Sequence, residues 1–165
     1  MSIAAQDKTA KKELTEKYFD TVYRLALCQT KQKQYADDVT QEVFLRFFKY
    51  EKDFDSEEHV KAWLIRVTIN CSKDIFLNSW FKKTAPLSEV KEVPVFDTEE
   101  KSDLYYAVID LPQKYKSVIH LFYYEDYSIK EIADCLGIKE STVKSQLHRG
   151  RELLKIKLKG EHQIV

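Results

Sequence analysis

The chain has 165 residues, of which 44% are hydrophobic and 13% aromatic, which is enough for one ordinary domain or two small ones and excludes a disordered polypeptide. Its 27 Lys and Arg residues balance 27 Asp and Glu residues, so any contact with nucleic acid must come from a local basic patch. No segment is apolar and long enough to cross a membrane, and the N-terminus has no apolar signal core. We therefore expect a cytoplasmic protein without direct membrane insertion.

Three cysteines, Cys28, Cys71 and Cys135, lie far apart in apolar helical patterns. Their number and spacing match neither a disulfide framework nor a zinc site. We expect small buried side chains in a reducing compartment, with a redox role as the alternative. No metal site and no other cofactor is expected.

The first eighty residues contain no proline and no glycine, since the first proline is Pro86 and the first glycine is Gly137. That half is therefore predicted to be nearly all helical. The first helix has an apolar seam and should end in the polar run 29–34. The seam consists of Leu14, Tyr18, Val22 and Leu25.

A second helix is predicted from about Ala36 to Tyr50. Asp37 and Asp38 should lie at its start, where carboxylates complement the helix dipole. The other face of this helix is acidic and polar. The apolar face consists of Val39, Val43 and Phe47, with Phe44 and Phe48 alongside.

A third helix should follow the loop 53–56, with Asp55 and Glu58 as a cap, and should end near Trp80. Its apolar seam consists of Val60, Trp63, Leu64, Val67, Cys71 and Ile75. The next segment, to Thr98, holds two prolines and no sustained period, which is typical of a linker.

Two more helices are predicted around Leu111 and Pro112. Asp97 and Glu100 would cap the first of them, which stops at this pair, and Pro112 would open the second. The second carries Val118, Ile119, Leu121 and Phe122 on its apolar face.

The segment 128–151 has the pattern of a helix-turn-helix. Ser128 and Glu131 form a capping box, and Gly137 stands where a left-handed residue must end the first helix. That helix directs Ile129, Ile132, Ala133 and Leu136 inward, and Ile138 can fill the corner. In the second helix the apolar positions are Val143, Leu147, Gly150, Leu154 and Leu158.

Basic residues outnumber acidic ones after this turn. Between 139 and 159 there are Lys139, Lys144, Arg149, Arg151, Lys155, Lys157 and Lys159 against Glu140 and Glu152. Such a face suits a phosphate backbone, so we favour DNA binding over a plain helical hairpin with a solvated surface. The fold class is all-α, with two small helical domains joined by a flexible linker and a helix-turn-helix in the C-terminal one. The domains are expected at 10–81 and 99–160, with the linker at 82–98.

Three segments in this order resemble the extracytoplasmic-function (ECF) group of bacterial sigma-70 factors. They are DDVTQEVF at 37–44, WLIRVTIN at 63–70, and the helix-turn-helix preceded by Leu111 and Pro112. The resemblance covers roughly 16–158. It implies a promoter-specificity subunit that binds core RNA polymerase, with promoter DNA and an anti-sigma factor as further partners and catalysis left to the polymerase.

The family pattern assigns each segment a role. Core polymerase would bind Asp37, Asp38, Gln41, Glu42 and Leu45, which recur on one helical ridge. The minus-ten element would be melted and held single-stranded by Val60, Lys61, Trp63, Arg66, Asn70 and Lys73, with walls from the loop 54–62. The duplex minus-thirty-five element would meet Ser128, Lys139, Ser141, Thr142, Lys144, Ser145, His148, Arg149 and Arg151.

Each role has a plainer alternative. The acidic ridge could be an ordinary solvated face, and Trp63 could be a core residue. Gln146 stands where the family often has arginine, and Gly150 where it often has alanine, which puts contacts at both positions in doubt. Asn78 and Ser79 replace a stretch that is often arginine-rich.

Two other functions compete with the sigma-factor interpretation. A stand-alone helix-turn-helix regulator would bind duplex DNA without polymerase. A DNA enzyme such as a recombinase would need a nucleophile with basic helpers, and no such cluster appears in the N-terminal half. We therefore expect no enzymatic activity.

Overall fold

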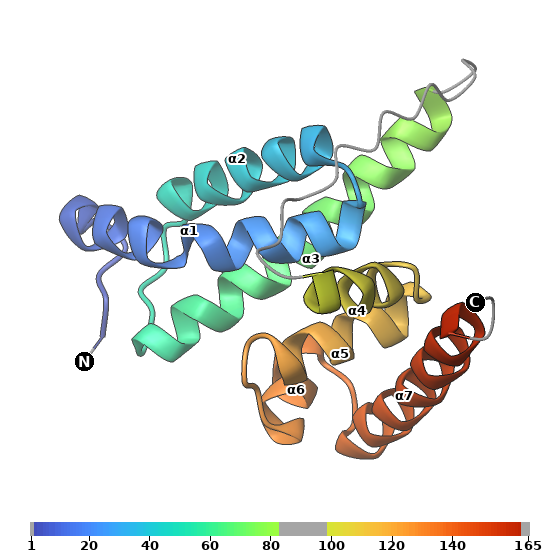
Figure 1. Cartoon of the computed structure of the whole chain (residues 1–165). Coiled ribbons are helices and arrows are strands. Elements are labelled where there is room, and N and C mark those ends of the chain that lie inside the picture. Colours follow the sequence, from blue (N-terminus) through green and yellow to red (C-terminus); the bar gives the residue numbers. More distant parts are fainter. Residues whose placement is uncertain (1, 83–98, 163–165) are drawn as a thin grey trace. The chain divides into compact units, whose positions relative to one another are not determined.

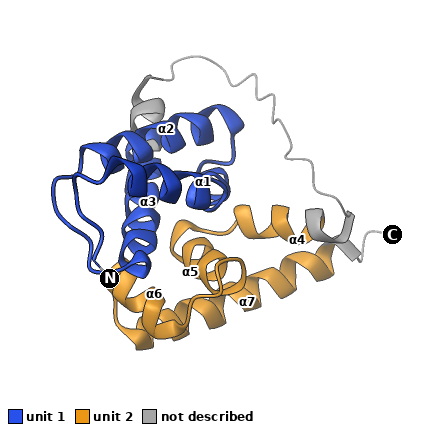
Figure 2. Cartoon of the chain, turned by 90° about the vertical axis from the view of Figure 1, so that its left-hand side faces the viewer, with its two compact units in different colours: residues 1–92 blue, residues 93–165 orange. Residues whose placement is uncertain are grey.

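Helices account for all regular structure in the described part of the chain, and one isolated bridge joins Ile3 to Phe54. The structure is a computed structural model that describes residues 2–82 and 99–162, and at 76–82, 99–102 and 161–162 it describes the backbone alone. The chain divides into two compact units, Met1–Glu92 and Val93–Val165 (Figure 2). The predicted all-α class is confirmed. The predicted linker lies, except for Lys82, outside the described residues.

Unit 1 consists of α1 (Lys8–Thr30), α2 (Lys33–Lys49) and α3 (Glu57–Lys82). α1 and α2 lie side by side, and α3 packs against both (Figure 1). Their apolar stripes meet in one core, in which Val22, Val39 and Leu64 are at most 1% exposed. The helical seams predicted for all three helices are present in this core.

The turn between α1 and α2 is shorter than the polar run 29–34 suggested. Gln29 and Thr30 belong to α1 and are buried, and the Thr30 hydroxyl donates to the carbonyl of Ala26 at 2.8 Å. Lys31 then adopts a left-handed conformation (φ 64°) and its amide donates to the carbonyl of Leu27. The first helix thus ends within the predicted run, but only residues 31–32 lie outside the helices, because polar side chains that bond to their own helix can be buried.

α2 begins three residues earlier than predicted, at Lys33. Asp37 and Asp38 consequently lie in its second turn, and the first turn holds no acidic residue, so the predicted dipole interaction at the start of α2 is wrong. The apolar face also differs from the prediction at one position. Phe47 is fully buried, whereas Phe48 is 46% exposed.

The cap of α3 also differs from the predicted one. Ser56, rather than Asp55, accepts a hydrogen bond from the backbone amide of His59 (3.1 Å) through its side chain. Asp55 instead donates its own amide to Nδ1 of His59 (3.2 Å). A serine hydroxyl caps a helix as well as a carboxylate does, so the helix still begins close to the predicted position.

Unit 2 consists of α4 (Glu99–Ile109), α5 (Gln113–Tyr123), α6 (Ile129–Leu136) and α7 (Glu140–His162). Pro112 is the N-cap of α5, as its fixed φ and missing N–H favour. The predicted cap of α4 involves Asp97, which lies outside the described residues. The core of this unit is formed by Val118, Ile119, Leu121, Ile132, Val143 and Leu147, each at most 1% exposed.

The helix-turn-helix has the predicted local structure in α6 and α7. Ser128 accepts the Glu131 amide at 3.1 Å, and the Glu131 carboxylate accepts the Ser128 amide at 3.5 Å. Gly137 has a φ of 68°, and the amide of Ile138 closes the turn on the carbonyl of Ala133 at 3.1 Å. The capping box and the left-handed glycine are both confirmed.

All three cysteines are buried and free, as expected from their apolar surroundings. Burial raises the pKa of the Cys71 thiol, which disfavours the reactive thiolate. None of the described helices combines the length and the hydropathy of a membrane span.

Candidate nucleic-acid interface

α7 carries the predicted DNA-binding side chains on one solvent-facing side. Lys144, Ser145, His148 and Arg149 are exposed, while Val143 and Leu147 anchor the opposite side in the core. The hydroxyl of Ser145 donates to the carbonyl of Ser141 at 2.8 Å, so its remaining capacity is as an acceptor. The helix therefore presents a polar face whose position is set by the packing beneath it.

One carboxylate partly neutralises this face. Glu152 lies 3.2 Å from Nε2 of His148 and 3.1 Å from a guanidinium nitrogen of Arg149. Both pairs are solvent-exposed, where a single ion pair contributes only about 0–1 kcal/mol. A phosphate group could therefore replace Glu152 as the partner of either side chain.

Further predicted DNA-binding residues lie near the starts of α6 and α7. Lys139 and Ser141 are exposed and Thr142 is half-buried, while Ser128 is exposed at the start of α6. The hydroxyl oxygen of Ser128 already accepts the capping bond, so in a complex this side chain retains mainly its O–H donor.

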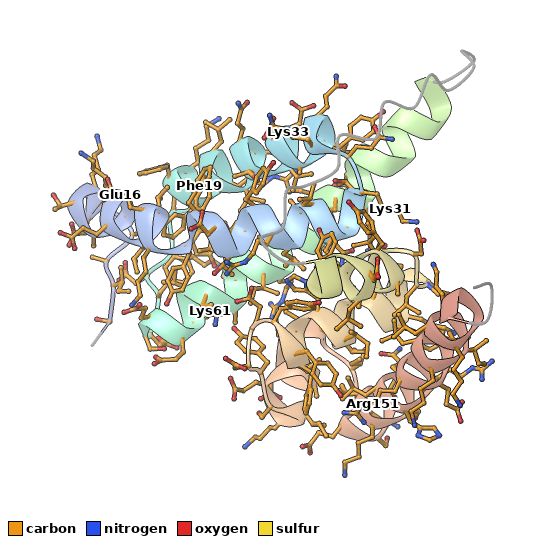
Figure 3. All side chains as sticks on the ribbon, in the orientation of Figure 1. Glu16, Phe19, Lys31, Lys33, Lys61 and Arg151 are labelled. Atoms are coloured by element: carbon orange, nitrogen blue, oxygen red, sulfur yellow. The ribbon has the colours of Figure 1, made fainter. Side chains whose placement is uncertain are left out.

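Arg151 of α7 (Figure 3) contacts aromatic side chains of α5. Its Nε donates to the hydroxyl of Tyr123 at 2.6 Å, and its guanidinium lies 5.5 Å from the ring centroids of Phe122 and Tyr123. Arg151 also borders an apolar groove of about 660 Å³. The rest of the groove lining is Leu104, Tyr105, Val108, Ile119, Tyr123, Tyr124, Leu154, Lys155 and Leu158. Arg151 is thus tied to α5, and sequence spacing could not indicate that bond.

α2 presents the predicted acidic ridge. Asp37, Asp38 and Gln41 are exposed, and Leu45 is 53% exposed. Glu42 is half-buried and pairs with Nε of Arg46 at 2.9 Å. The ridge therefore combines exposed carboxylates with an exposed apolar side chain.

Two aromatic residues that sequence reasoning did not assign to this surface are also exposed. Phe19 (Figure 3) is 47% exposed on α1 and stacks on Phe44 with ring centroids 6.0 Å apart, and Phe48 is 46% exposed on α2. Phe19 lies one residue beyond the seam position Tyr18, so its displacement from the stripe was the available signal.

α3 presents Arg66, Asn70 and Lys73 on one exposed row, with the i, i+4, i+7 spacing of a helix face. Lys61 is half-buried near the start of the helix (Figure 3). Val60 requires a correction, because its side chain is 0% exposed within the core of unit 1. Val60 packs α3 onto this core and is not available to contact a base.

Trp63 is half-buried in an aromatic cluster rather than fully buried as a core residue would be. Its ring centroid lies 5.0 Å from that of Tyr50 and 5.9 Å from those of Phe47 and Phe54. The segment 54–62, expected to form a loop that walls an unpaired base, differs from that prediction. Phe54 is 0% exposed, and residues from Glu57 onward are helical. The exposed edge of the cluster is formed by His59, Tyr50 and Trp63.

Both helical units match known protein families in sequence. Residues 14–81 match the model of sigma-70 region 2, and residues 102–154 match that of sigma-70 region 4. SigM of Bacillus subtilis, an ECF RNA polymerase sigma factor, is 30% identical over 87% of this chain and 91% of its own. The chain belongs to the ECF sigma factors.

Other relatives agree with this assignment. SigW of Bacillus subtilis is 28% identical over 93% of this sigma factor and 91% of its own length. Among solved structures, the sigma factor RpoE in complex with the anti-sigma factor NepR from Bartonella quintana covers 90% of this chain and 96% of its own, with a TM-score of 0.70 and 19% identity. CnrH in complex with the cytosolic domain of CnrY has a TM-score of 0.67 and 18% identity over 94% of this chain and 91% of its own. These two structures share the fold.

Two departures from the family pattern have a place in the structure of the sigma factor. Gly150 is buried, and a β-carbon there would lie 3.0 Å from Cγ1 of Ile119, so this position packs against α5 instead of facing DNA. Gln146 is half-buried at the edge of the exposed face of α7. Asn78 and Ser79 lie where only the backbone is described.

Proposed function

We propose that this sigma factor performs promoter recognition with three separate faces, one for polymerase and two for DNA. The observation that carries the proposal is that regions 2 and 4 fold as helical units whose predicted contact residues are, except for Val60, exposed or half-buried. Binding energy drives promoter opening in this scheme, so the chain needs no catalytic group, and phosphodiester chemistry remains with the polymerase.

The ridge of α2 is the proposed site for core polymerase. Exposed carboxylates at Asp37 and Asp38 steer a basic partner surface, and Leu45 supplies apolar contact area. Gln41 lies between them at helical spacing. Glu42 is a weaker candidate for direct contact, because Arg46 already pairs with it.

The row on α3 is the proposed site for the unpaired minus-ten strand. An extruded base needs a stacking surface and hydrogen-bond groups that read its edge. The exposed edge of the Trp63 cluster offers the first, and the Asn70 amide offers donors and acceptors. Lys61, Arg66 and Lys73 lie on the same helix, where they would contact phosphates.

α7 is the proposed recognition helix for the duplex minus-thirty-five element. Lys144 and Arg149 would contact phosphates or base edges from the major groove, with His148 and Ser145 between them. Arg151 is held by Tyr123 and would contact DNA only at the edge of the site. The DNA backbone would be approached at the start of the two helices by Lys139, which precedes α7, by Ser141 and Thr142 of α7, and by Ser128, the N-cap of α6.

We further propose a cytoplasmic location and control by an anti-sigma protein. Of the two solved structures with the same fold, one is a sigma factor in complex with an anti-sigma factor and the other is CnrH in complex with the cytosolic domain of CnrY. A partner of this kind would compete with core polymerase for the apolar side chains exposed in the free chain, such as Phe19, Leu45 and Phe48.

Reconstituted transcription with core polymerase over a promoter library tests the three faces separately. Asp38→Ala should lower the affinity for core polymerase at every promoter. Asn70→Ala should reduce open complexes and minus-ten preference without changing core affinity. If Asn70→Ala leaves both unchanged, the base-capture role is wrong.

Lys144→Ala separates two kinds of DNA contact. A phosphate contact predicts weaker binding at all promoters and a salt slope lower by about one, whereas a base contact predicts altered preference at one position. The stand-alone regulator makes a different prediction, namely no association with core polymerase and tight binding of the free chain to duplex DNA.

A further inference from the structure

The residues ahead of the region 2 match are attached to the loop between α2 and α3. The match begins at residue 14. Ile3 and Phe54 exchange both backbone hydrogen bonds, at 2.7 and 2.9 Å, and the amide of Ala5 donates to Oδ1 of Asp53 at 2.7 Å. We call residues 3–11 the N-terminal strap and residues 50–56 the α2–α3 loop. The strap thus supplies hydrogen bonds to a loop that lies outside the helices of unit 1.

Lys11 makes a second connection between the strap and this loop. Its side chain is among the largest fully buried ones in the described structure, with 1% exposure. Nζ donates to the carbonyls of Tyr50 at 2.9 Å and Phe48 at 3.4 Å, and it lies 5.6 Å from the ring centroid of Phe47. The last carbonyls of a helix lack intrahelical partners and favour a cation, so Lys11 caps the C-terminal end of α2.

Burial of this lysine is unfavourable without such partners. Desolvation lowers the pKa of the Lys11 amine below its ordinary value. Lysines are almost never fully buried unless their amines find acceptors. The carbonyls at the end of α2 and the Phe47 ring supply that compensation, and a rearrangement of the loop would remove the shorter of the two hydrogen bonds, the one to Tyr50.

The loop held in this way forms part of the aromatic cluster around Trp63. Tyr50 begins the loop, with its ring 5.0 Å from Trp63 and 5.1 Å from Phe54. Phe54 in turn lies 5.9 Å from Trp63, with an edge-on geometry. A displacement of the loop would therefore change the stacking surface that α3 offers to an unpaired base.

We infer that the N-terminal strap, acting mainly through Lys11, is a positioning element for promoter opening that holds the α2–α3 loop and the Trp63 cluster ready to receive an unpaired minus-ten base. The inference rests on the proposed role of α3 in minus-ten capture. Lys11 touches no base and acts through the Tyr50 and Phe48 carbonyls. A loop that is already ordered loses less conformational entropy on binding, so preorganisation raises affinity for the captured strand.

Three variants of the first helix test the role of the Lys11 amine. Lys11→Met keeps the length of the side chain and removes its donors, Lys11→Arg keeps donors, and Lys12→Met makes the same change at an exposed neighbour. The measurements are holoenzyme assembly and binding of a single-stranded oligonucleotide with the minus-ten element selected from the promoter library. We expect Lys11→Met to assemble normally but to bind the oligonucleotide about tenfold more weakly, since small misplacements at a site have effects of this order or larger. Lys11→Arg should recover most of the affinity, and Lys12→Met should match the wild type.

A pair of variants at Asp53 tests the strap without altering a buried group. Asp53→Asn and Asp53→Ala remove the same charge, but only asparagine keeps an oxygen that accepts the Ala5 amide. Removing a carboxylate near DNA should by itself strengthen binding to the phosphate backbone. Weaker oligonucleotide binding by Asp53→Ala than by Asp53→Asn would therefore report on the lost hydrogen bond rather than on charge.

The inference is overturned if folded Lys11→Met binds the oligonucleotide as tightly as the wild type. If Lys11→Met does not fold, the Asp53 pair decides, and equal binding by its two members overturns the inference. Failure of the underlying proposal is a different result, in which Trp63→Ala and Asn70→Ala both leave oligonucleotide binding unchanged in the holoenzyme.

Discussion

Gly150 of α7 packs against Ile119 of α5 so closely that a β-carbon at position 150 would lie 3.0 Å from Cγ1 and 3.3 Å from Cδ1 of that isoleucine. Glycine inside a helix destabilises it by about 1 kcal/mol relative to alanine. Here the missing side chain allows α7 to approach the core of its unit. Glycine at this position therefore lowers helix propensity but permits close packing of α7 against α5.

This relationship predicts the effect of filling the position. We expect Gly150→Ala to lower the free energy of unfolding by up to about 1 kcal/mol, because crowding of Ile119 outweighs the gain in helix propensity. Gly150→Val should lower it by about 1–3 kcal/mol. Urea unfolding of both variants, with Ile119→Val as the partner in a double-mutant cycle, measures the coupling. Stabilisation by Gly150→Ala would mean that Ile119 moves aside without strain.

The glycine of the turn should respond differently. Gly137 has a φ of 68°, and a β-carbon at this position would have no neighbouring atom within 4 Å, so alanine there meets backbone strain but no clash. We expect Gly137→Ala to lower the free energy of unfolding by about 1–2 kcal/mol, and Gly137→Asn by less. Gly160→Ala is the matched control, because that position is also open but has no positive φ, and alanine there should be neutral or stabilising. Equal effects at both positions would contradict the role of the left-handed turn.

Glu152 should limit the affinity of α7 for DNA. Its carboxylate pairs with both His148 and Arg149, so Glu152→Gln releases two groups for phosphate. We expect the variant holoenzyme to bind duplex minus-thirty-five DNA about three- to tenfold more tightly, with a steeper salt dependence and weaker discrimination between sequences. Glu140→Gln removes an equal charge at the start of α7, where no ion pair joins Glu140 to either residue among the described contacts. If the two variants behave alike, the effect is general electrostatics and not release of the paired residues.

Glu57 should make unit 1 sensitive to acid. The hydrogen bonds that Lys17 and Tyr18 donate to its carboxylate lower its pKa, with Lys17 the larger cause. A carboxylate with a lowered pKa in the folded state contributes stability above its ordinary pKa of 4.5, and the contribution is lost as the pH falls through the lowered value. We expect the melting temperature of the wild type to exceed that of Glu57→Gln near neutral pH and the difference to vanish in acid. A difference that is constant with pH would contradict the assignment.

Tyr18 offers a check on the same cluster. Its hydroxyl donates to Glu57 at 2.8 Å, and burial together with this bond raises the pKa of Tyr18. In Tyr18→Phe the Glu57 carboxylate loses one donor, so its pKa should be lowered less than in the wild type. The stability that Glu57 contributes should therefore be lost at a higher pH than in the wild type. Thermal melts across the acidic range measure the shift.

Local sequence determined the elements whose interactions span only a few residues. The capping box of Ser128 and Glu131, the left-handed Gly137 and the proline at the start of α5 all follow from contacts within one turn of the chain. The apolar seams of the helices follow from periodicity in the same way. The order of the three motifs along the chain is by itself enough to indicate the family.

Tertiary packing decided which residues of a helix face are covered. Periodicity indicates the apolar side of a helix, but the side chains at the edge of that stripe depend on where the neighbouring helices end. Phe44 is buried, with the ring of Phe19 from α1 6.0 Å away, whereas Phe48 is exposed, although both are apolar residues beside the predicted seam. Lys11 is the clearest case, because its burial requires carbonyl acceptors about forty residues away, at the end of α2. Such a contact exists only after the chain has folded, because residues this far apart in sequence meet only through the packing of α1 against α2.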